Sequence, residues 1–254
     1  MFIDTHCHIS DEYYDDIDTV ILENEQAGIE KIIVCGCDKE EIKTTINYIN
    51  KYSNLFATIG YHPAEASKIT DSDISNLEKL ICSNKKIVGI GEIGLDYHYG
   101  KEAILIQQEV FRKQLSLAEK LHLPVVIHSR DATEDTINCL KKYNVTGVVH
   151  CFSGSVETAK QYVSMGYKIG IGGVLTFKNS KLYEVVQAVG IKNIVLETDA
   201  PYLAPTPFRG KQNSSKYIPY IAAAVADVLN ISVEEVAKIT TLNACELFDL
   251  KVDL

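Results

Sequence analysis

The feature that most constrains the fold of this chain is a repeated alternation of short apolar runs with helical segments. Each run is rich in β-branched residues, ends at a polar or glycine-containing stop, and precedes a segment with helical periodicity. The eight runs cover residues 2–8, 31–36, 55–63, 86–97, 123–130, 145–152, 167–173 and 193–201. Apolar strands that alternate with helices are typical of a parallel sheet buried on both faces.

Eight such units in 254 residues predict an α/β fold of the (β/α)8 TIM-barrel type. No Gly/Ser-rich or Pro-rich linker interrupts the chain, so we predict a single domain over residues 1–254. Residues 101–122 have apolar side chains mostly on one helical face and are expected to form a helix.

The end of the chain is expected to hold a long loop and two helices. Three prolines preclude a regular helix over 201–216, which we interpret as an active-site loop after the eighth strand. Residues 217–248 predict two helices, the second opening with a capping box between Ser232 and Glu235.

Composition and charge limit the classes of function. The chain is 46% hydrophobic and 23% charged, as expected of a globular domain, and its formal net charge is -9. That charge argues against non-specific binding of long nucleic acid through a basic surface. A small phosphate-bearing substrate remains compatible with it, because bound metal ions change the local field.

The cysteines and the first residues of the chain indicate the cellular compartment of the protein. The seven cysteines are odd in number, form no CxxC pair and lie partly in apolar runs, which indicates reduced thiols in a cytoplasmic protein. The first residues lack the pattern of a signal peptide, and no apolar run is long enough to span a bilayer. We therefore expect no membrane association.

Potential metal ligands gather at the predicted strand ends, where (β/α)8 proteins build their active sites. Five of the seven histidines lie there, and two carboxylates end the fourth and eighth strands. These residues are His6, His8, His62, His128, His150, Glu92 and Asp199.

His6 and His8 are two residues apart on a strand, so both imidazoles project from the same face. Neutral imidazole nitrogen is a good ligand for a divalent metal, although an isolated HxH pair is equally compatible with a partly buried polar pair. Convergence with the other strand-end ligands favours metal binding. The metal-ligand prediction comprises His6, His8, Glu92, His128, His150 and Asp199.

Six ligands are too many for one tetrahedral ion and suit two ions that share a bridge. Glu92 is the expected bridge, since its two oxygens can each bind one ion and the surrounding GIGEIG sequence offers no cation. Asp199 is expected to bind one ion and to accept a proton from the attacking water. Glu197 lies deeper on the same strand face and is interpreted as a supporting or purely structural residue.

The assembled motifs closely resemble the TatD family of metal-dependent deoxyribonucleases, within the amidohydrolase superfamily. The resemblance covers essentially the whole chain. It rests on FIDTHCH (2–8), GYHP (60–63), GEIGLDYH (91–98), VIHSRDA (126–132), HCFSG (150–154), ETDAPYL (197–203) and, more weakly, PFRGKQN (207–213).

The resemblance implies that His6, His8 and Asp199 hold one metal ion, that Glu92 bridges, and that His128 and His150 hold the second. It also implies hydrolysis of phosphodiester bonds, commonly as a 3′→5′ exonuclease on DNA ends or single-stranded DNA. We expect a metal-bridging hydroxide to attack phosphorus in line, with Zn²⁺, Mg²⁺, Mn²⁺ or Co²⁺ as the two ions.

The residues expected to contact substrate phosphate are His62, Arg130, Ser153 and Arg209. One stretch departs from the family pattern. After RGK the family usually has Arg-Asn-Glu-Pro or something near it, whereas this chain has Gln-Asn-Ser-Ser at 212–215. A cation is thus missing where the loop could approach a nucleic-acid backbone.

Two alternatives stay open at this point. The same ligands could serve an acyl-ester hydrolase, such as a deacylase of D-aminoacyl-tRNA, or a small-substrate amidohydrolase, so RNA or tRNA is a second possible partner. A non-catalytic metal-binding barrel is disfavoured, because a scaffold has no physical need for an activated water. No obligate protein partner is inferred.

Overall fold

The computed structural model describes residues 1–98, 100 and 103–251. Seven of the eight predicted apolar runs contain a strand, and the second run, 31–36, lies within a strand that begins two residues earlier. The strands are β1 (Phe2–Cys7), β2 (Ile29–Gly36), β3 (Leu55–Ile59), β4 (Ile87–Asp96), β5 (Val125–Arg130), β6 (Gly147–Val149), β7 (Tyr167–Ile171) and β8 (Ile194–Leu196).

Helices follow the strands in regular alternation. The α-helices are α1 (Ile17–Gln26), α2 (Lys39–Lys51), α3 (Asp71–Ser83), α4 (Ile104–Leu121), α5 (Thr133–Leu140), α6 (Val156–Ser164), α7 (Leu182–Val189), α8 (Ile218–Leu229) and α9 (Val233–Phe248). Short 3-10 helices are η1 (Pro63–Lys68), η2 (Gly173–Thr176), η3 (Ile191–Asn193) and η4 (Ser215–Tyr217).

The strands are parallel, and their order in the eight-stranded sheet is the chain order from β1 to β8. This topology confirms the predicted α/β fold of the (β/α)8 type. All ten residues of β4 are buried, as expected of a parallel strand covered on both faces.

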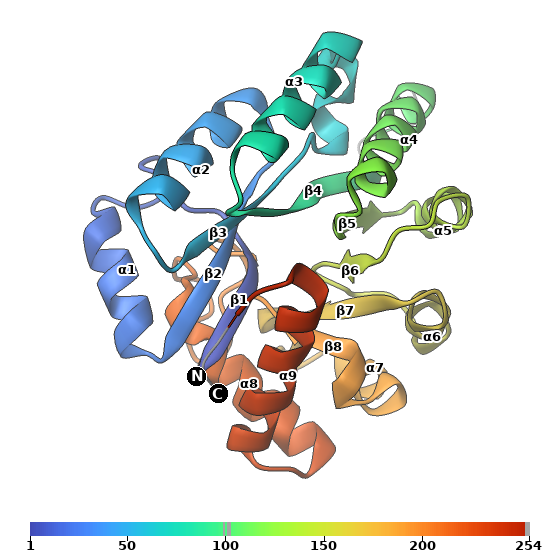
Figure 1. Cartoon of the computed structure of the whole chain (residues 1–254). Helices are drawn as coiled ribbons and strands as arrows, with labels where there is room; N and C mark the ends of the chain where they lie inside the picture. The colour runs from blue at the N-terminus through green and yellow to red at the C-terminus, as the bar shows by residue number, and fades with distance from the viewer. Residues whose placement is uncertain (99, 101–102, 252–254) are drawn as a thin grey trace. The chain divides into compact units, whose positions relative to one another are not determined.

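Contacts within the chain group it into two compact units. Unit 1 comprises residues 1–34 and 150–254, and unit 2 comprises residues 35–149. In unit 1, β1 pairs with β2 and β7 pairs with β8, while α9 packs against β1 and β8 (Figure 1). In unit 2, β3, β4, β5 and β6 pair in sequence, and α4 packs against β4. The single-domain prediction stays a prediction.

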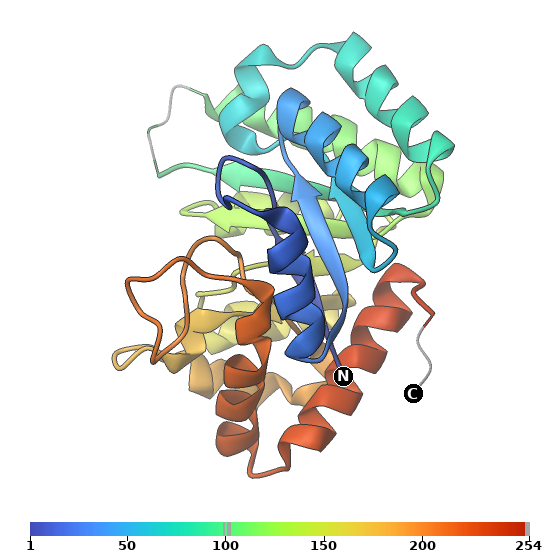
Figure 2. The same ribbon diagram turned by 90° about the vertical axis from the view of Figure 1, so that its left-hand side faces the viewer.

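The predicted helices and loop are present. Helix α4 lies within the predicted range 101–122, of which residues 101 and 102 lie outside the described residues. The segment between β8 and α8 forms a long excursion without an α-helix (Figure 2). The Ser232 hydroxyl caps α9 by accepting a hydrogen bond from the Glu235 amide, which is the first half of the predicted capping box.

No helix in the described part of the chain has both the length and the apolar character needed to cross a membrane.

The β5–β6 pair requires a residue without a side chain at one position. Gly147 pairs with Val125, and a Cβ on Gly147 would lie 2.1 Å from the Val125 carbonyl oxygen. By contrast, a Cβ on Gly172 would find its nearest neighbour at 3.6 Å, an ordinary contact. Gly147 therefore sets how closely these two strands approach.

We expect Gly147→Ala to lower the free energy of unfolding by about 2–3 kcal/mol, because β6 must move away from β5 and the packing around it must shift. Gly172→Ala is the matched control and should stay within about 0.5 kcal/mol of the parent. Urea unfolding monitored by circular dichroism measures both. Equal stabilities for the two variants would contradict the proposed close approach.

Candidate metal-binding site

Backbone pairing between the end of β1 and the segment after β8 positions the first group of ligands. The His6 carbonyl accepts a hydrogen bond from the Asp199 amide (3.0 Å), and the His8 amide donates to the Ala200 carbonyl (2.7 Å). Cys7 and Ala200 form a parallel bridge between the same segments. Asp199 has a φ of 54°, a left-handed conformation that aspartate tolerates better than most residues.

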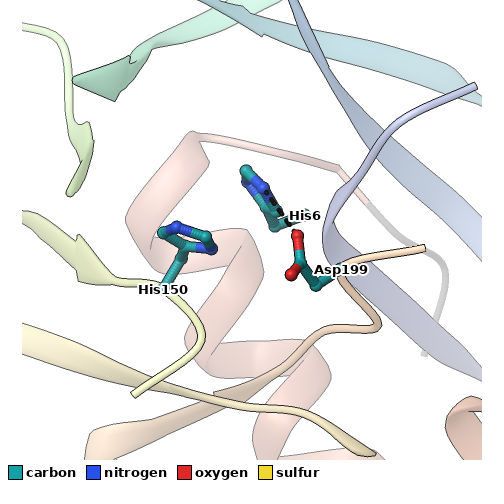
Figure 3. Close-up of side chains that lie close together, drawn as sticks. All are labelled: His6, His150 and Asp199. Carbon is teal, nitrogen blue, oxygen red and sulfur yellow. Dashed lines mark ion pairs between the residues drawn. The ribbon is translucent and has the colours of Figure 1, made fainter. Parts of the chain in front are cut away.

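Within unit 1 these segments bring His6, His8, His150 and Asp199 together, a set that we call the His6 cluster. Asp199 Oδ1 lies 3.6 Å from His6 Nε2 and 3.9 Å from His8 Nε2. The rings of His6 and His150 have centroids 4.2 Å apart (Figure 3). One ligand atom from each of His6, His150 and Asp199 lies within 4.8 Å of the others.

The donor chemistry of the His6 cluster fits a divalent cation. Zn–N and Zn–O bonds of about 2.0–2.2 Å place two donors of one ion within about 4.4 Å of each other. His6 and His150 are buried and Asp199 is half-buried, so the nitrogen and oxygen donors are largely shielded from water. Cys7, between His6 and His8, is fully buried, and its thiol faces the Ile33 carbonyl at 3.9 Å.

Asp4 forms hydrogen bonds to residues that carry or adjoin ligands of the His6 cluster. This fully buried carboxylate accepts hydrogen bonds from the Thr198 hydroxyl (2.6 Å), the Thr198 amide (3.0 Å) and the His6 amide (3.3 Å). Burial raises the pKa of Asp4 to about 6, although these hydrogen bonds, together with one from Ser215, pull the pKa down. Asp4 therefore holds the backbone at His6 and at Thr198, the residue before Asp199, in a fixed position.

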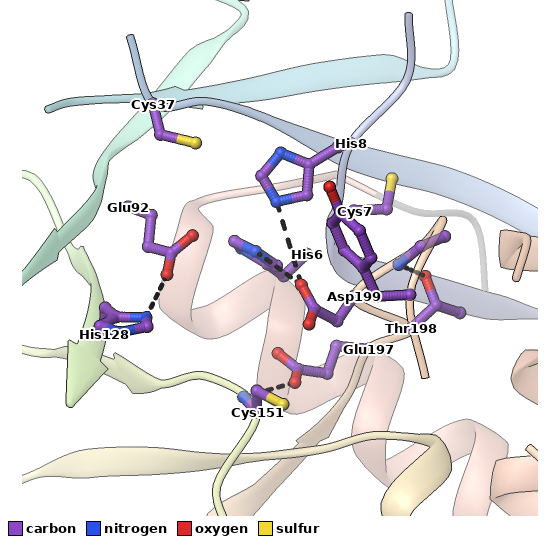
Figure 4. Close-up of polar contacts among 12 residues, drawn as sticks. His6, Cys7, His8, Cys37, Glu92, His128, Cys151, Glu197, Thr198 and Asp199 are labelled. Atoms are coloured by element: carbon purple, nitrogen blue, oxygen red, sulfur yellow. Dashed lines mark hydrogen bonds and ion pairs between the residues drawn. The ribbon is translucent and has the colours of Figure 1, made fainter. Parts of the chain in front are cut away.

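Glu197 is the second buried carboxylate of unit 1. Its Oε1 accepts a hydrogen bond from the Cys151 amide at 2.5 Å, and its Oε2 has no hydrogen-bond partner among the described residues (Figure 4). Burial raises the pKa of Glu197 to about 8; the charge of His150 opposes the shift and that of Asp199 adds to it. Gly170 leaves room for this carboxylate, because a Cβ there would lie 2.8 Å from Oε2.

Unit 2 carries a second group of potential ligands on the neighbouring strands β4 and β5. Asp96 ends β4, Glu92 lies four residues earlier in the same strand, and His128 lies in the second half of β5. His128 Nδ1 lies 2.6 Å from Glu92 Oε1, and His128 Nε2 lies 3.1 Å from Asp96 Oδ2 (Figure 4 draws the first contact). Burial raises the pKa of Asp96, but hydrogen bonds from His128 and the His98 amide outweigh it and lower the pKa overall. An imidazole between two carboxylates marks a place that favours positive charge.

His62 lies beside this second group. Its Nε2 is 3.7 Å from Glu92 Oε1, and its ring packs edge-on against His128 with centroids 4.5 Å apart. Its Nδ1 accepts a hydrogen bond from the Ala64 amide at 3.1 Å, which caps η1 and fixes the ring. Ligand atoms of His62, Asp96 and His128 lie within 4.8 Å of one another. We call His62, Glu92, Asp96 and His128 the His128 cluster.

The other predicted substrate contacts lie on exposed surfaces. Arg130 ends β5 and is exposed, and its positive charge contributes to the lowered pKa of Asp96. Ser153 is exposed in the turn after β6. Arg209 does not simply extend into water: its guanidinium stacks over the Phe177 ring at 3.6 Å. The predicted roles of these side chains stay predictions.

Comparison with known proteins agrees with the sequence motifs. The family described as TatD related DNase matches residues 3–249. The metal-dependent hydrolase YabD of Bacillus subtilis is 42% identical over 253 residues, covering 98% of this chain and 99% of that protein. The chain belongs to the TatD family of metal-dependent hydrolases.

Solved structures support the assignment. The TatD homologue YjjV of Escherichia coli superimposes with a TM-score of 0.92 at 32% identity, over 98% of each chain. A TatD family hydrolase of Entamoeba histolytica gives a TM-score of 0.87 at 26% identity, over 97% of each chain. The organophosphorus hydrolase of Deinococcus radiodurans, at 10% identity and a TM-score of 0.65, shares the fold alone.

Two residues of this TatD-family site were not assigned from the sequence. Asp96 was not predicted as a site residue, although its position four residues after Glu92 on one strand puts both carboxylates on one face. Glu197 was kept out of the ligand set, yet it binds the Cys151 amide directly after His150. The spacing could have indicated Asp96, but no local signal could have indicated the contact between Glu197 and Cys151.

We expect Glu197 to make the metal-free protein less stable as pH rises. The pKa of Glu197 is raised from 4.5 to about 8 by folding, so the native state retains the proton that the unfolded state loses. The corresponding stability is fully present below pH 4.5 and is lost as pH rises towards 8, at no more than about 1.4 kcal/mol per pH unit.

Glu197→Gln, which imitates the neutral acid, should remove this part of the pH dependence. Urea unfolding in the presence of a chelator, at several pH values between 5 and 8, measures it for both proteins. Parallel stability curves for the parent and the variant would show that Glu197 is already ionised in the folded protein.

Proposed function

We propose that this protein is a metal-dependent deoxyribonuclease that removes nucleotides from DNA ends or from single-stranded DNA. The observation that carries the proposal is the His6 cluster, whose nitrogen and oxygen donors lie within metal-binding distance at the carboxyl end of β1 and beyond β8. The family name, TatD related DNase, supports a nucleic-acid substrate.

Two divalent ions are proposed, one at the His6 cluster of unit 1 and one at the His128 cluster of unit 2. His6, His8 and Asp199 are proposed to bind the first ion, with His150 close enough to join them. Glu92 and His128 are proposed to bind the second. The bridging role of Glu92 and the pairing of His150 with His128 stay predictions, as does the cytoplasmic location.

The bound ions would supply an activated water and neutralise charge on the phosphate. The residues of the chain then have separate tasks. Asp199 would accept the proton of the attacking water, since its Oδ1 lies 3.6 Å from His6 Nε2 and 3.9 Å from His8 Nε2, beside the place where the first ion would bind. The phosphorus–oxygen bond to the neighbouring sugar would break, and the departing oxygen would take up a proton, from Asp199 or from solvent, to leave a hydroxyl on the shortened strand.

Substrate phosphate would be held by a small number of side chains. We propose His62, Arg130, Ser153 and Arg209 for this role, with arginine offering a bidentate fork. The stacking of Arg209 on Phe177 fixes one guanidinium face and leaves its edge to an anion. This restricted set agrees with a net charge of -9, which disfavours extended electrostatic binding of DNA.

An assay of end-labelled single-stranded DNA with added Mg²⁺, Mn²⁺, Co²⁺ or Zn²⁺ tests the proposal directly. Parallel measurement on D-aminoacyl-tRNA tests deacylation, the alternative that uses the same ligands on an ester bond. Cleavage of DNA at the higher rate supports the nuclease. No cleavage of DNA by protein shown to contain metal would exclude it.

We expect Asp199→Asn to lower the rate constant of DNA cleavage by about 10²- to 10⁴-fold, because the amide cannot accept the proton. His122→Asn is the matched control. His122 is exposed at the left-handed end of α4, a conformation that asparagine also adopts, so activity and stability should be unchanged. Undiminished cleavage by Asp199→Asn would assign the proton transfer to another group.

Metal analysis of the purified variants tests the two proposed ions. The parent and His122→Asn should contain two ions per chain. His6→Ala with His8→Ala should remove one, and His128→Ala should remove the other, because each change deletes ligands of a single cluster. If the parent protein contains one tightly bound ion and both variants lose it completely, the chain has one metal site and the proposal of two sites is wrong.

A further inference from the structure

An aromatic pair adjoins the His6 cluster within unit 1. The ring of Tyr202 has its centroid 6.4 Å from the His8 ring and 6.1 Å from the Tyr13 ring, with interplanar angles of 68° and 71°. The Tyr202 hydroxyl donates a hydrogen bond to the Tyr13 hydroxyl at 3.3 Å. Tyr202 is 50% exposed, so a large apolar surface faces water three residues beyond Asp199.

We propose that Tyr202, held in place by its hydrogen bond and ring contact with Tyr13, is a stacking platform for a nucleobase of the substrate strand. The inference rests on the proposed nuclease function and adds the recognition of the base. An exposed tyrosine beside ligands of a phosphate-binding ion can accept the base attached to the same nucleotide or its neighbour. Stacking tolerates every base, because each base has a π face.

The backbone of Tyr202 is held on both sides, as a binding platform requires. Its amide donates to the Asp199 carbonyl at 2.9 Å, and its carbonyl accepts from Asn213 Nδ2 at 2.6 Å. The same Asn213 nitrogen donates to the Thr198 carbonyl at 2.8 Å, and Asn213 is fully buried. A ring fixed in this way loses little conformational freedom when a base stacks on it.

The loop also supports Tyr13. Gln212 Nε2 donates to the Tyr13 carbonyl, and Tyr14 donates its hydroxyl proton to the Asn213 carbonyl at 2.9 Å. Gln212 stands where the family usually has arginine, whereas Asn213 matches the asparagine of the family pattern. At the position of the missing cation, this chain therefore uses the Gln212 side-chain amide to hold the backbone of Tyr13.

Charge on this surface favours a base over a phosphate as the bound group. Asp11, Glu12 and Asp15 are exposed near Tyr13 in the sequence, and their carboxylates would repel a phosphate backbone. Stacking does not depend on attraction between opposite charges. An acidic protein can thus bind the end of a strand through one metal-held phosphate and one stacked base.

The test measures binding of short single-stranded oligonucleotides that carry the fluorescent base 2-aminopurine at one position near the end. Phosphorothioate linkages slow cleavage during the titration, and the parent protein is used in its metal-loaded form. Stacking on a tyrosine should quench 2-aminopurine fluorescence at one position. A second series replaces the base at that position with an abasic site.

We expect Tyr202→Ala to weaken binding of the intact oligonucleotide by about 5- to 150-fold and to abolish the quenching. Tyr202→Phe should retain both, because the ring remains. On the abasic oligonucleotide, the parent and Tyr202→Ala should bind equally. Tyr183→Ala is the matched control: Tyr183 is 45% exposed on α7 of the same unit, its hydroxyl donates to Glu184, and its removal should change nothing.

Three outcomes would overturn the platform. Equal affinities of the parent and Tyr202→Ala for the intact oligonucleotide would remove Tyr202 from base recognition. An equal loss on intact and abasic oligonucleotides would assign Tyr202 a purely structural role, which thermal unfolding of Tyr202→Ala and Tyr202→Phe would reveal. Hydrolysis of a peptide or of a non-nucleotide ester at a higher rate than DNA, with a loss of that activity in Tyr202→Ala, would assign the surface to another ligand.

Failure of the proposed function has a different signature. In that case the metal-loaded parent would neither cleave nor bind any oligonucleotide, whatever residue stands at position 202.

Discussion

The buried Asp4 carboxylate is the interaction on which the arrangement of unit 1 depends. It accepts hydrogen bonds from the Thr198 amide and hydroxyl and from the His6 amide, and so connects strand β1 to the segment after β8. An unsatisfied buried donor costs about 1–3 kcal/mol, so loss of this carboxylate would leave several expensive groups at one place. Because His6 and Asp199 lie next to its partners, the same contact that stabilises the fold sets the separation of the ligands.

The two clusters show different ways of holding titratable groups in a protein interior. In the His128 cluster, an imidazole lies between Glu92 and Asp96, and its contact helps to lower the pKa of Asp96. In unit 1, burial dominates and raises the pKa of both Asp4 and Glu197. The histidine–carboxylate contacts of the His128 cluster form between neighbouring strands. The burial of Asp4 and Glu197 depends instead on packing between strands far apart in the sequence.

This difference explains how much could be predicted from the sequence. The eight strands follow from their apolar runs, and the position of His6 and His8 at the end of β1 follows from the parallel topology. The prediction that Glu92 ends the fourth strand was wrong, because β4 continues for four residues to Asp96. Burial of Cys7 follows from its place in a parallel strand covered on both faces, since all six residues of β1 are buried. For the strands, a periodicity of a few residues carries the information.

Contacts between residues far apart in the sequence could not be predicted from a local periodicity. Asn213 binds Thr198 and Tyr202, and Arg209 stacks on Phe177, only because the long loop after β8 returns to its own strand end. The three prolines predict that this loop has no regular helix, but they do not say which side chains hold it in place. Its ordered form depends on amide and aromatic contacts that the pattern of the sequence leaves open.

The acidity of the chain is then easier to reconcile with an anionic substrate. In unit 1 burial raises the pKa of Glu197, and repulsion from the Asp199 and Asp4 carboxylates adds to the shift. A divalent ion at the His6 cluster would reduce that repulsion, so metal binding and proton release must be coupled. The negative charge of the site therefore favours binding of the divalent ion before binding of the anionic substrate. Recognition beyond the metal-held phosphate would then have to use contacts that do not require positive charge, which is the property of an exposed aromatic ring.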